Sequence, residues 1–190
     1  MVQFGVFLYR WRGVVGFIAF WFVWYFSRPS WQTILISLPI TFVGLILRCW
    51  AAGYMTNGTQ SRELSGQLLV TNGPYRYVQN PLYLGNFFLT LGILISSVLP
   101  LYLTLSIIFL FWVEYWLIIK AEKGFLTNRF GDRYLAYCKT TGSILPRLRK
   151  PNITLNNHCF RLRNALREVK TILILLLAYW FIYLKTTVRN

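Results

Sequence analysis

Long runs of apolar residues constrain this chain more than any other feature. Of its 190 residues, 56% are hydrophobic and only 13% are charged, which is far from the composition of a soluble domain. A helix needs about 20 residues to cross the hydrocarbon core of a bilayer, and fewer where aromatic residues and snorkelling cations finish its ends. The sequence therefore predicts an all-α, polytopic membrane protein with about five transmembrane helices. These are expected at residues 13–26, 31–50, 83–99, 101–119 and 171–184, the first and last being short.

Pro100 separates two of the apolar runs with almost no polar linker. Because proline lacks a backbone donor and clashes with the preceding turn of a helix, we expect a tight helical hairpin here. The two polar ends of such a hairpin lie on the same side of the membrane. The hairpin should therefore bring residues 53–82 and 120–146 together at one membrane surface.

The basic residues of the chain predict its sidedness. The net charge is +15, and twelve residues from Lys120 to Lys170 are Lys or Arg. Positively charged loops remain in the cytoplasm, so the shared polar face is expected to be cytosolic, in a bacterial inner membrane or the endoplasmic reticulum. Arg10 and Arg12 place the amino terminus on that side too. Cations beside apolar runs are typical of proteins that contact anionic headgroups, so we expect membrane lipids and no nucleic acid as partners.

Residues 158–170 mix apolar and basic side chains at a spacing close to that of an amphipathic helix. We expect this helix to lie in the membrane interface as an anchor. Substrate capture is the alternative role for the same segment.

The cysteine and histidine content gives no support for a metal or disulfide site. Cys49, Cys138 and Cys159 are odd in number and lack CxxC spacing, and His158 is the only histidine. We therefore expect no bound metal and structural roles for the three cysteines.

Two stretches of the chain carry a specific pattern. The first contains Gly73-Pro74-Tyr75 and Asn80-Pro81-Leu82-Tyr83, and the second begins at Glu122 and continues through Phe130-Gly131, Tyr134 and Tyr137 to Pro146. Together they resemble the isoprenylcysteine carboxyl methyltransferase family and its phospholipid methyltransferase relatives. The resemblance implies a membrane-embedded enzyme that moves a methyl group from S-adenosylmethionine to a small lipophilic acceptor. It also implies one integral membrane domain over residues 1–190, with N-terminal spans at 1–52, a catalytic core at 53–146, and a basic interfacial segment with the last apolar helix at 147–190.

The resemblance assigns the cofactor site to a loop, to the first stretch and to a glutamate at the cytosolic end of the next helix. In this role Glu122 can accept hydrogen bonds from ribose hydroxyls or the adenine amine, while Tyr75 and Tyr83 can cover apolar faces. The residues that fall on cofactor-contacting positions are Gln60, Gln67, Leu68, Leu69, Val70, Tyr75, Asn80, Pro81, Leu82, Tyr83 and Glu122.

Three positions depart from the family pattern. Asn80 stands where the family has a histidine, so it can hydrogen-bond but cannot carry a proton near neutral pH. Lys123 replaces the second member of a Glu-Glu pair. Ile118 falls where the family has an arginine that is expected to hold the acceptor carboxylate, and isoleucine cannot do so.

Glu114 is an ionisable residue within an apolar span, a placement that is costly and usually functional. Because Glu114, Ile118 and Glu122 repeat every four residues, they share one helix face. Glu114 is therefore a candidate catalytic residue that attracts or deprotonates an amine acceptor, although it could instead pair with Arg48 or another buried cation. The pocket is expected to be acidic, and to prefer a neutral or amine-bearing lipid over a prenylcysteine carboxylate. If a carboxylate is methylated, Arg76 and Lys120 are the candidate cations that hold it.

Two other functions remain open at this stage. A membrane reductase that uses NADPH has a related hairpin and loop layout, although no G-x-G-x-x-G fingerprint is present. A degenerate relative that serves as a membrane scaffold subunit is suggested by Ile118 and Asn80. The retained Gln60, Tyr75 and Glu122 favour the enzyme.

Overall fold

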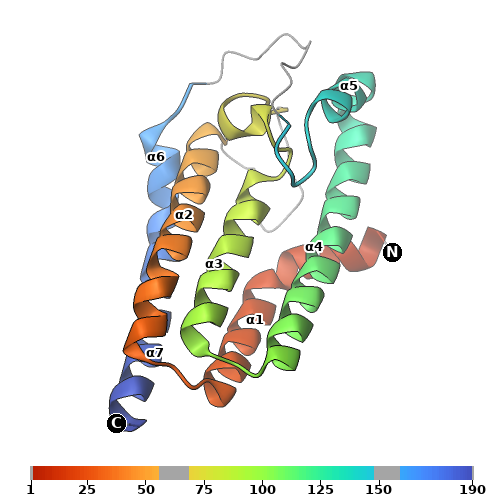
Figure 1. The fold of residues 1–190 in the computed structure, drawn as a ribbon. Helices are drawn as coiled ribbons and strands as arrows, with labels where there is room; N and C mark the ends of the chain where they lie inside the picture. Colours follow the sequence, from red (N-terminus) through yellow and green to blue (C-terminus); the bar gives the residue numbers. More distant parts are fainter. Residues whose placement is uncertain (1, 56–68, 148–158, 190) are drawn as a thin grey trace.

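The computed structural model describes residues 2–55, 69–147 and 159–189. Within these ranges the chain is all-α and its helices form a bundle (Figure 1), so the predicted fold class is confirmed. The elements are α1 (Val2–Phe26), α2 (Trp31–Tyr54), the 3₁₀ turn η1 (Gly73–Arg76), α3 (Pro81–Ser97), α4 (Leu101–Phe130), α5 (Asp132–Thr140), α6 (Leu162–Ala165), the 3₁₀ turn η2 (Leu166–Glu168) and α7 (Val169–Arg189).

Four helical stretches of the described residues are long and apolar enough to cross a membrane. They are Gln3–Phe26, Trp31–Tyr54, Leu101–Phe130 and Leu162–Val188. The fifth predicted span corresponds to α3, a shorter apolar helix of 17 residues. The chain is thus a polytopic membrane protein, and its first and last helices are longer than the sequence predicted because they extend beyond the apolar runs.

The hairpin predicted at Pro100 is confirmed. Helix α3 ends at Ser97, Val98 adopts a φ of +46°, and Pro100 precedes the first residue of α4. The polar ends of α3 and α4 both lie at the opposite end of the bundle, where η1 and α5 lie (Figure 1). A short parallel bridge pairs Val78 with Gly142 there, and the amide of Gln79 donates to the Gly142 carbonyl at 2.7 Å.

Helices α2 and α3 pack most closely of all the helix pairs in the described residues. At Gly85 a Cβ atom would lie only 2.6 Å from Cγ of Arg48, so a larger residue would push the helices apart. Small residues that allow such a close approach are typical of interfaces between membrane helices. The approach lays the side chain of Arg48 along α3.

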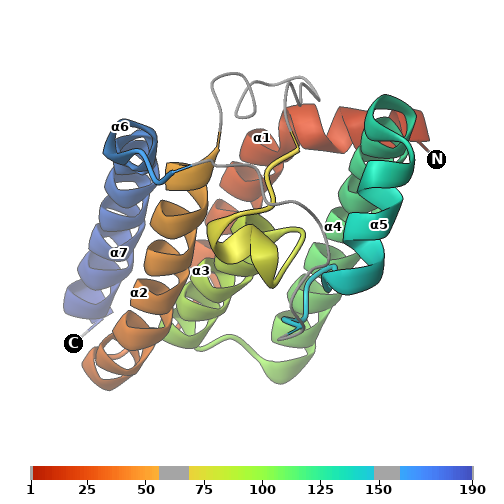
Figure 2. The ribbon, with the colours of Figure 1, turned by 90° about the horizontal axis from the view of Figure 1, so that it is seen from above.

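Helix α1 crosses α4 on the other side of the bundle, as the view from above shows (Figure 2). At Gly5 a Cβ atom would lie 2.5 Å from the carbonyl oxygen of Leu117. This crossing brings Tyr9 of α1 into one buried cluster with Tyr83, Tyr115 and Ile118.

The segment for which an interfacial helix was predicted, residues 158–170, is helical from Leu162 onward in the part that the structure describes. Its placement in the membrane interface stays a prediction. Here α6, η2 and α7 follow one another and dock on the end of α2. The amide of Arg161 donates to the Gly53 carbonyl at 2.8 Å, and Nδ2 of Asn164 donates to the Met55 carbonyl at 2.6 Å. These bonds satisfy carbonyls at the end of α2 and hold Glu168 in a buried position.

Candidate active site

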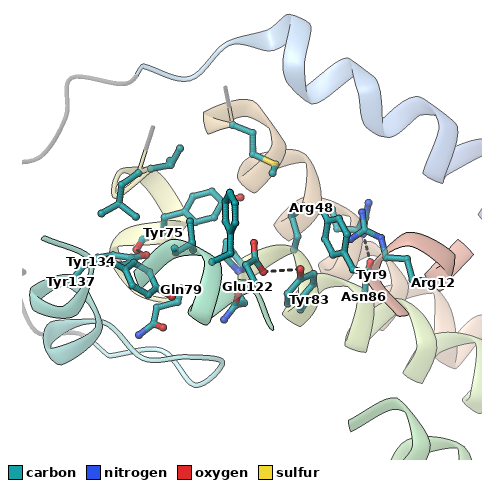
Figure 3. Close-up of a pocket in the computed structure, with 18 of the residues that line it drawn as sticks. Tyr9, Arg12, Arg48, Tyr75, Gln79, Tyr83, Asn86, Glu122, Tyr134 and Tyr137 are labelled. Carbon is teal, nitrogen blue, oxygen red and sulfur yellow. Dashed lines mark hydrogen bonds between the residues drawn. The ribbon is translucent and has the colours of Figure 1, made fainter. Parts of the chain in front are cut away.

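A cavity of about 290 Å³ lies where the segment from Leu69, the start of α3 and the second half of α4 come together. It is elongated, and its two ends differ (Figure 3). We call Tyr75, Tyr134 and Tyr137 the tyrosine end. We call Tyr9, Arg12, Arg48 and Asn86 the arginine end. Glu122 and Tyr83 lie between them.

The tyrosine end is built by η1 and α5, which the hairpin brings together. The hydroxyl of Tyr137 donates to the Tyr75 carbonyl at 2.6 Å, so α5 fixes the η1 turn directly. Tyr134 and Tyr137 also form a buried cluster with Leu69. Burial raises the pKa of all three tyrosines above the ordinary value, and the nearby Glu122 carboxylate adds to this for Tyr75. Their hydroxyls are therefore neutral donors at physiological pH.

The centre of the cavity holds a carboxylate that is oriented by a tyrosine. The Tyr83 hydroxyl donates to Oε2 of Glu122 at 2.9 Å. The Tyr83 ring stands edge-to-face on Tyr115, with 5.0 Å between ring centroids, which fixes its position. Within the described residues this bond engages only one carboxylate oxygen, so Oε1 of Glu122 keeps its acceptor capacity for a ligand.

At the arginine end, Arg48 is fully engaged. Its Nη2 lies 2.7 Å from Oε2 of Glu168, and its Nε donates to the same oxygen at 2.8 Å. Its Nη1 donates to Oδ1 of Asn86, and its Nη2 also donates to Oγ1 of Thr171 at 3.3 Å. Thr171 in turn donates to Glu168 at 2.9 Å, so the pair is embedded in a hydrogen-bonded network.

Arg12 enters the same end of the cavity from α1. The guanidinium carbon lies 4.3 Å from the centroid of the Tyr9 ring, and Arg12 also hydrogen-bonds to Tyr9 (Figure 3). Among the described residues, Arg48 and Glu168 form the ion pair that lies within 4.0 Å. No described carboxylate lies within this distance of Arg12.

The phospholipid methyltransferase family model matches residues 33–133, slightly more than half of the chain. The chain belongs to this family. The family recognition from the sequence is thereby confirmed. The matched region contains α2, α3, α4 and the η1 turn, and hence the centre of the cavity.

Two curated relatives carry the name protein-S-isoprenylcysteine O-methyltransferase. The one from Dictyostelium discoideum is 31% identical over 144 residues, which cover 70% of this chain and 58% of the relative. The one from Schizosaccharomyces pombe is 34% identical over 88 residues, which cover 45% of this chain and 36% of the relative. The chain thus spans little more than half of the first relative and about a third of the second. No solved structure matches the chain significantly.

The structure brings eight of the eleven cofactor-site candidates to one cavity. Gln60, Gln67 and Leu68 lie outside the described residues. Asn80 lines the cavity while its Nδ2 donates to the Ser143 carbonyl at 3.0 Å. The candidates that line the cavity are Leu69, Val70, Tyr75, Asn80, Pro81, Leu82, Tyr83 and Glu122.

The two candidate catalytic residues do not line the cavity. Arg76 ends the η1 turn and Glu114 lies half-buried on α4, and neither is among the lining residues. Glu114 is near enough to Arg12 to interact with its charge. The alternative that Glu114 pairs with Arg48 is wrong, because the carboxylate on Arg48 is that of Glu168.

The expectation of an acidic pocket is also wrong. Two arginines, Arg12 and Arg48, line the cavity together with two glutamates, Glu122 and Glu168. From the sequence, Arg12 indicated only the side of the membrane on which the amino terminus lies, and Arg48 was predicted only as a possible ion-pair partner of Glu114. The signal that could have found them is the one that singled out Glu114, since an ionisable residue within or beside an apolar helix is a functional candidate by default.

Proposed function

We propose that this chain is a membrane methyltransferase that transfers the methyl group of S-adenosylmethionine to an oxygen atom of a lipophilic acceptor. The observation that carries the proposal is the Tyr83–Glu122 pair, which lies in a cavity between the tyrosine end and the arginine end. This pair belongs to the region that the family model matches. The names of the curated relatives support an oxygen acceptor.

The residues of the cavity fit S-adenosylmethionine chemically. Oε1 of Glu122 can accept from the ribose hydroxyls or the adenine amine, and Leu69 and Val70 line the same cavity. The faces of Tyr75, Tyr134 and Tyr137 suit a flat base or a cationic sulfonium centre. When bound, the cofactor supplies a methyl group that its sulfonium activates.

In such a reaction the protein positions the methyl donor and the acceptor and excludes water from the site. Holding donor and acceptor in line supplies much of the rate of a displacement, because the entropy of bringing them together is lost beforehand. The Tyr83 hydroxyl and the Tyr115 ring hold Glu122 in one orientation. Phe125 and Leu126 of α4 add apolar lining to the same cavity, and an apolar lining limits access of water to the reacting atoms.

We also place the cavity on the cytosolic face, where a water-soluble cofactor meets a lipid-soluble acceptor. Arg147 follows α5 at the cavity end of the bundle, and Arg28 lies in the α1–α2 turn at the other end. Single cysteines at these two positions, in a background without the native cysteines, should be labelled from opposite sides. Labelling of Arg147→Cys from outside the cell would contradict the cytosolic placement.

Titration calorimetry tests the donor. The purified protein in detergent is titrated with S-adenosylmethionine, with its demethylated product and with NADPH. We expect the first two to bind and NADPH not to bind. Binding of NADPH alone would favour the reductase, and binding of none would favour a scaffold subunit.

A further inference from the structure

The charges that line the cavity are not balanced evenly along its length. At the arginine end, Glu168 neutralises Arg48 at 2.7 Å. In the middle, Glu122 accepts a hydrogen bond from Tyr83, a neutral group. Arg12 is close enough to Glu114 for their charges to interact, but Glu114 lies outside the cavity, and no carboxylate of the described residues lies within 4.0 Å of Arg12. The negative charge of Glu122 at the centre and the positive charge of Arg12 at the end therefore face one cavity.

Resting on the proposed function, we propose that Arg12 of α1 binds the anionic oxygen group of the acceptor, and that Tyr9 positions Arg12 for this. The substrate class that follows is a lipophilic carboxylate, not an amine. Arg12 is then the residue that determines acceptor specificity.

The way in which Arg12 is held leaves it able to bind an anion. A guanidinium that lies over an aromatic ring uses its flat face for that contact, while its N–H groups point outward in its own plane. The guanidinium carbon is 4.3 Å from the Tyr9 ring centroid. Arg12 has five N–H groups and Tyr9 has a single hydroxyl, so most of the donors remain for a bidentate contact with a carboxylate.

Tyr9 is itself fixed, so the position of Arg12 is defined. Tyr9 is 6% exposed and shares a buried cluster with Tyr83, Tyr115 and Ile118. Tyr83 is the residue that donates to Glu122. One rigid group of side chains therefore connects the proposed acceptor cation with the proposed cofactor carboxylate.

Ile118 explains why the cation comes from another helix. This residue is fully buried on α4, and Tyr9 belongs to the same cluster. The close crossing of α1 and α4 near Gly5 makes room for α1 to supply a charge where α4 has an apolar side chain. Because α1 precedes residues 33–133, a comparison confined to the family-matched region does not include this cation.

The chemistry balances without a proton transfer. A carboxylate oxygen contributes the electron pair that forms the new O–CH₃ bond, the S–CH₃ bond breaks, and its electron pair stays on sulfur as a neutral thioether. The negative acceptor and the positive sulfonium both become neutral. An amine acceptor would instead need a base, and Glu168, the carboxylate that lines the cavity beside Arg48, is occupied by that arginine.

The test compares Arg12→Met with Arg10→Met, which removes an exposed charge two residues away on the same helix. Methyl transfer from radiolabelled S-adenosylmethionine to N-acetyl-S-farnesylcysteine is measured in detergent micelles, together with cofactor affinity. We expect Arg12→Met to raise the acceptor KM or lower kcat/KM by about 10- to 100-fold, with unchanged cofactor affinity. Arg10→Met should behave as wild type. Equal acceptor kinetics for Arg12→Met and wild type would overturn the proposal.

A second measurement separates charge recognition from packing. The carboxamide of the same compound is used as a competitive inhibitor, and its affinity is compared with that of the carboxylate. Wild type should prefer the carboxylate, Arg12→Lys should keep part of this preference, and Arg12→Met should lose it. A preference that survives in Arg12→Met would assign the anion to another cation. If wild type binds the cofactor and methylates only amines, the inference fails while the proposed function in its general form stands. If wild type binds no cofactor, the proposed function fails first.

Discussion

The tyrosine end and the arginine end of the cavity are built in different ways. The tyrosine end comes from η1 and α5, which belong to the two stretches that carry the family pattern and are tied by main-chain bonds such as that of Gln79 to Gly142. The arginine end comes from α1, α2, α3 and η2, and its Arg12, Arg48 and Glu168 lie outside those two stretches. The family pattern thus defines one end, and tertiary packing of residues outside the pattern defines the other.

The two ends also differ in what stabilises them. Aromatic burial and a carbonyl hydrogen bond hold the tyrosine end, and these interactions are modest one at a time. The arginine end contains a buried ion pair, and removing one member leaves the charge of the other uncompensated, which strongly destabilises the fold. We therefore expect substitutions at the arginine end, except those of Arg12, to lower mainly the free energy of unfolding. Substitutions towards the tyrosine end should lower mainly the affinity for the cofactor.

The largest expected effect is that of Glu168→Ala on stability. The substitution leaves the Arg48 guanidinium buried without its counter-charge, which costs about 3–5 kcal/mol of unfolding free energy. Glu168→Gln retains a hydrogen-bond acceptor and should cost less. The measurement is denaturant unfolding in detergent, followed by titration of the surviving folded protein with S-adenosylmethionine.

The same experiment tests whether the two ends of the cavity act independently. If folded Glu168→Ala loses cofactor affinity as strongly as stability, the ends act as one unit. A combined Arg48→Met and Glu168→Leu variant should regain most of the stability, because it removes both charges together. Failure of the combined variant to recover would mean that the hydrogen bonds to Asn86 and Thr171 matter more than the charges.

The difference between the ends also explains what could be predicted from the sequence. The all-α membrane fold and the hairpin at Pro100 follow from apolar length and from one proline. Of the eight cofactor-site candidates that line the cavity, seven lie between Leu69 and Tyr83, and the eighth is Glu122. All eight belong to the segments that the family pattern assigns to the cofactor. Arg12 and Glu168 lie outside those segments, and only the crossing of α1 with α4 and the docking of α6 on α2 bring them to the cavity.

Glu114 shows the limit of helix-face reasoning. Its spacing from Glu122 places both on one face of an ideal helix, and the inference that both line one pocket follows only if that whole face borders the pocket. In the structure Glu122 lines the middle of the cavity, whereas Ile118 and Glu114 on the same helix face do not line it. Residue spacing predicts which face of a helix a side chain occupies. How far a cavity extends along that face depends on the neighbouring helices.

Glu122→Ala should have the second largest effect, this time on the cofactor. Loss of a buried hydrogen-bond acceptor costs about 1–3 kcal/mol of S-adenosylmethionine affinity, measured by titration calorimetry. Glu114→Ala is the matched control, since it removes a carboxylate from the same helix outside the cavity. Equal losses in both variants would indicate a long-range effect of charge and would remove Glu122 from the cofactor site.

The smallest expected effect is that of Tyr137→Phe, which removes the hydroxyl that donates to the Tyr75 carbonyl at 2.6 Å. The ring still packs in its cluster with Leu69, so the loss should be about 0.5–1.5 kcal/mol of cofactor affinity, with little change in stability. Burial raises the pKa of Tyr137, so the hydroxyl stays protonated and the bond persists below the ordinary pKa of tyrosine. The difference between wild type and Tyr137→Phe should therefore be the same from about pH 6 to about pH 9. A difference that shrinks across this range would mean that the hydroxyl ionises in the folded protein, and that Tyr137 does not orient η1 as a neutral donor.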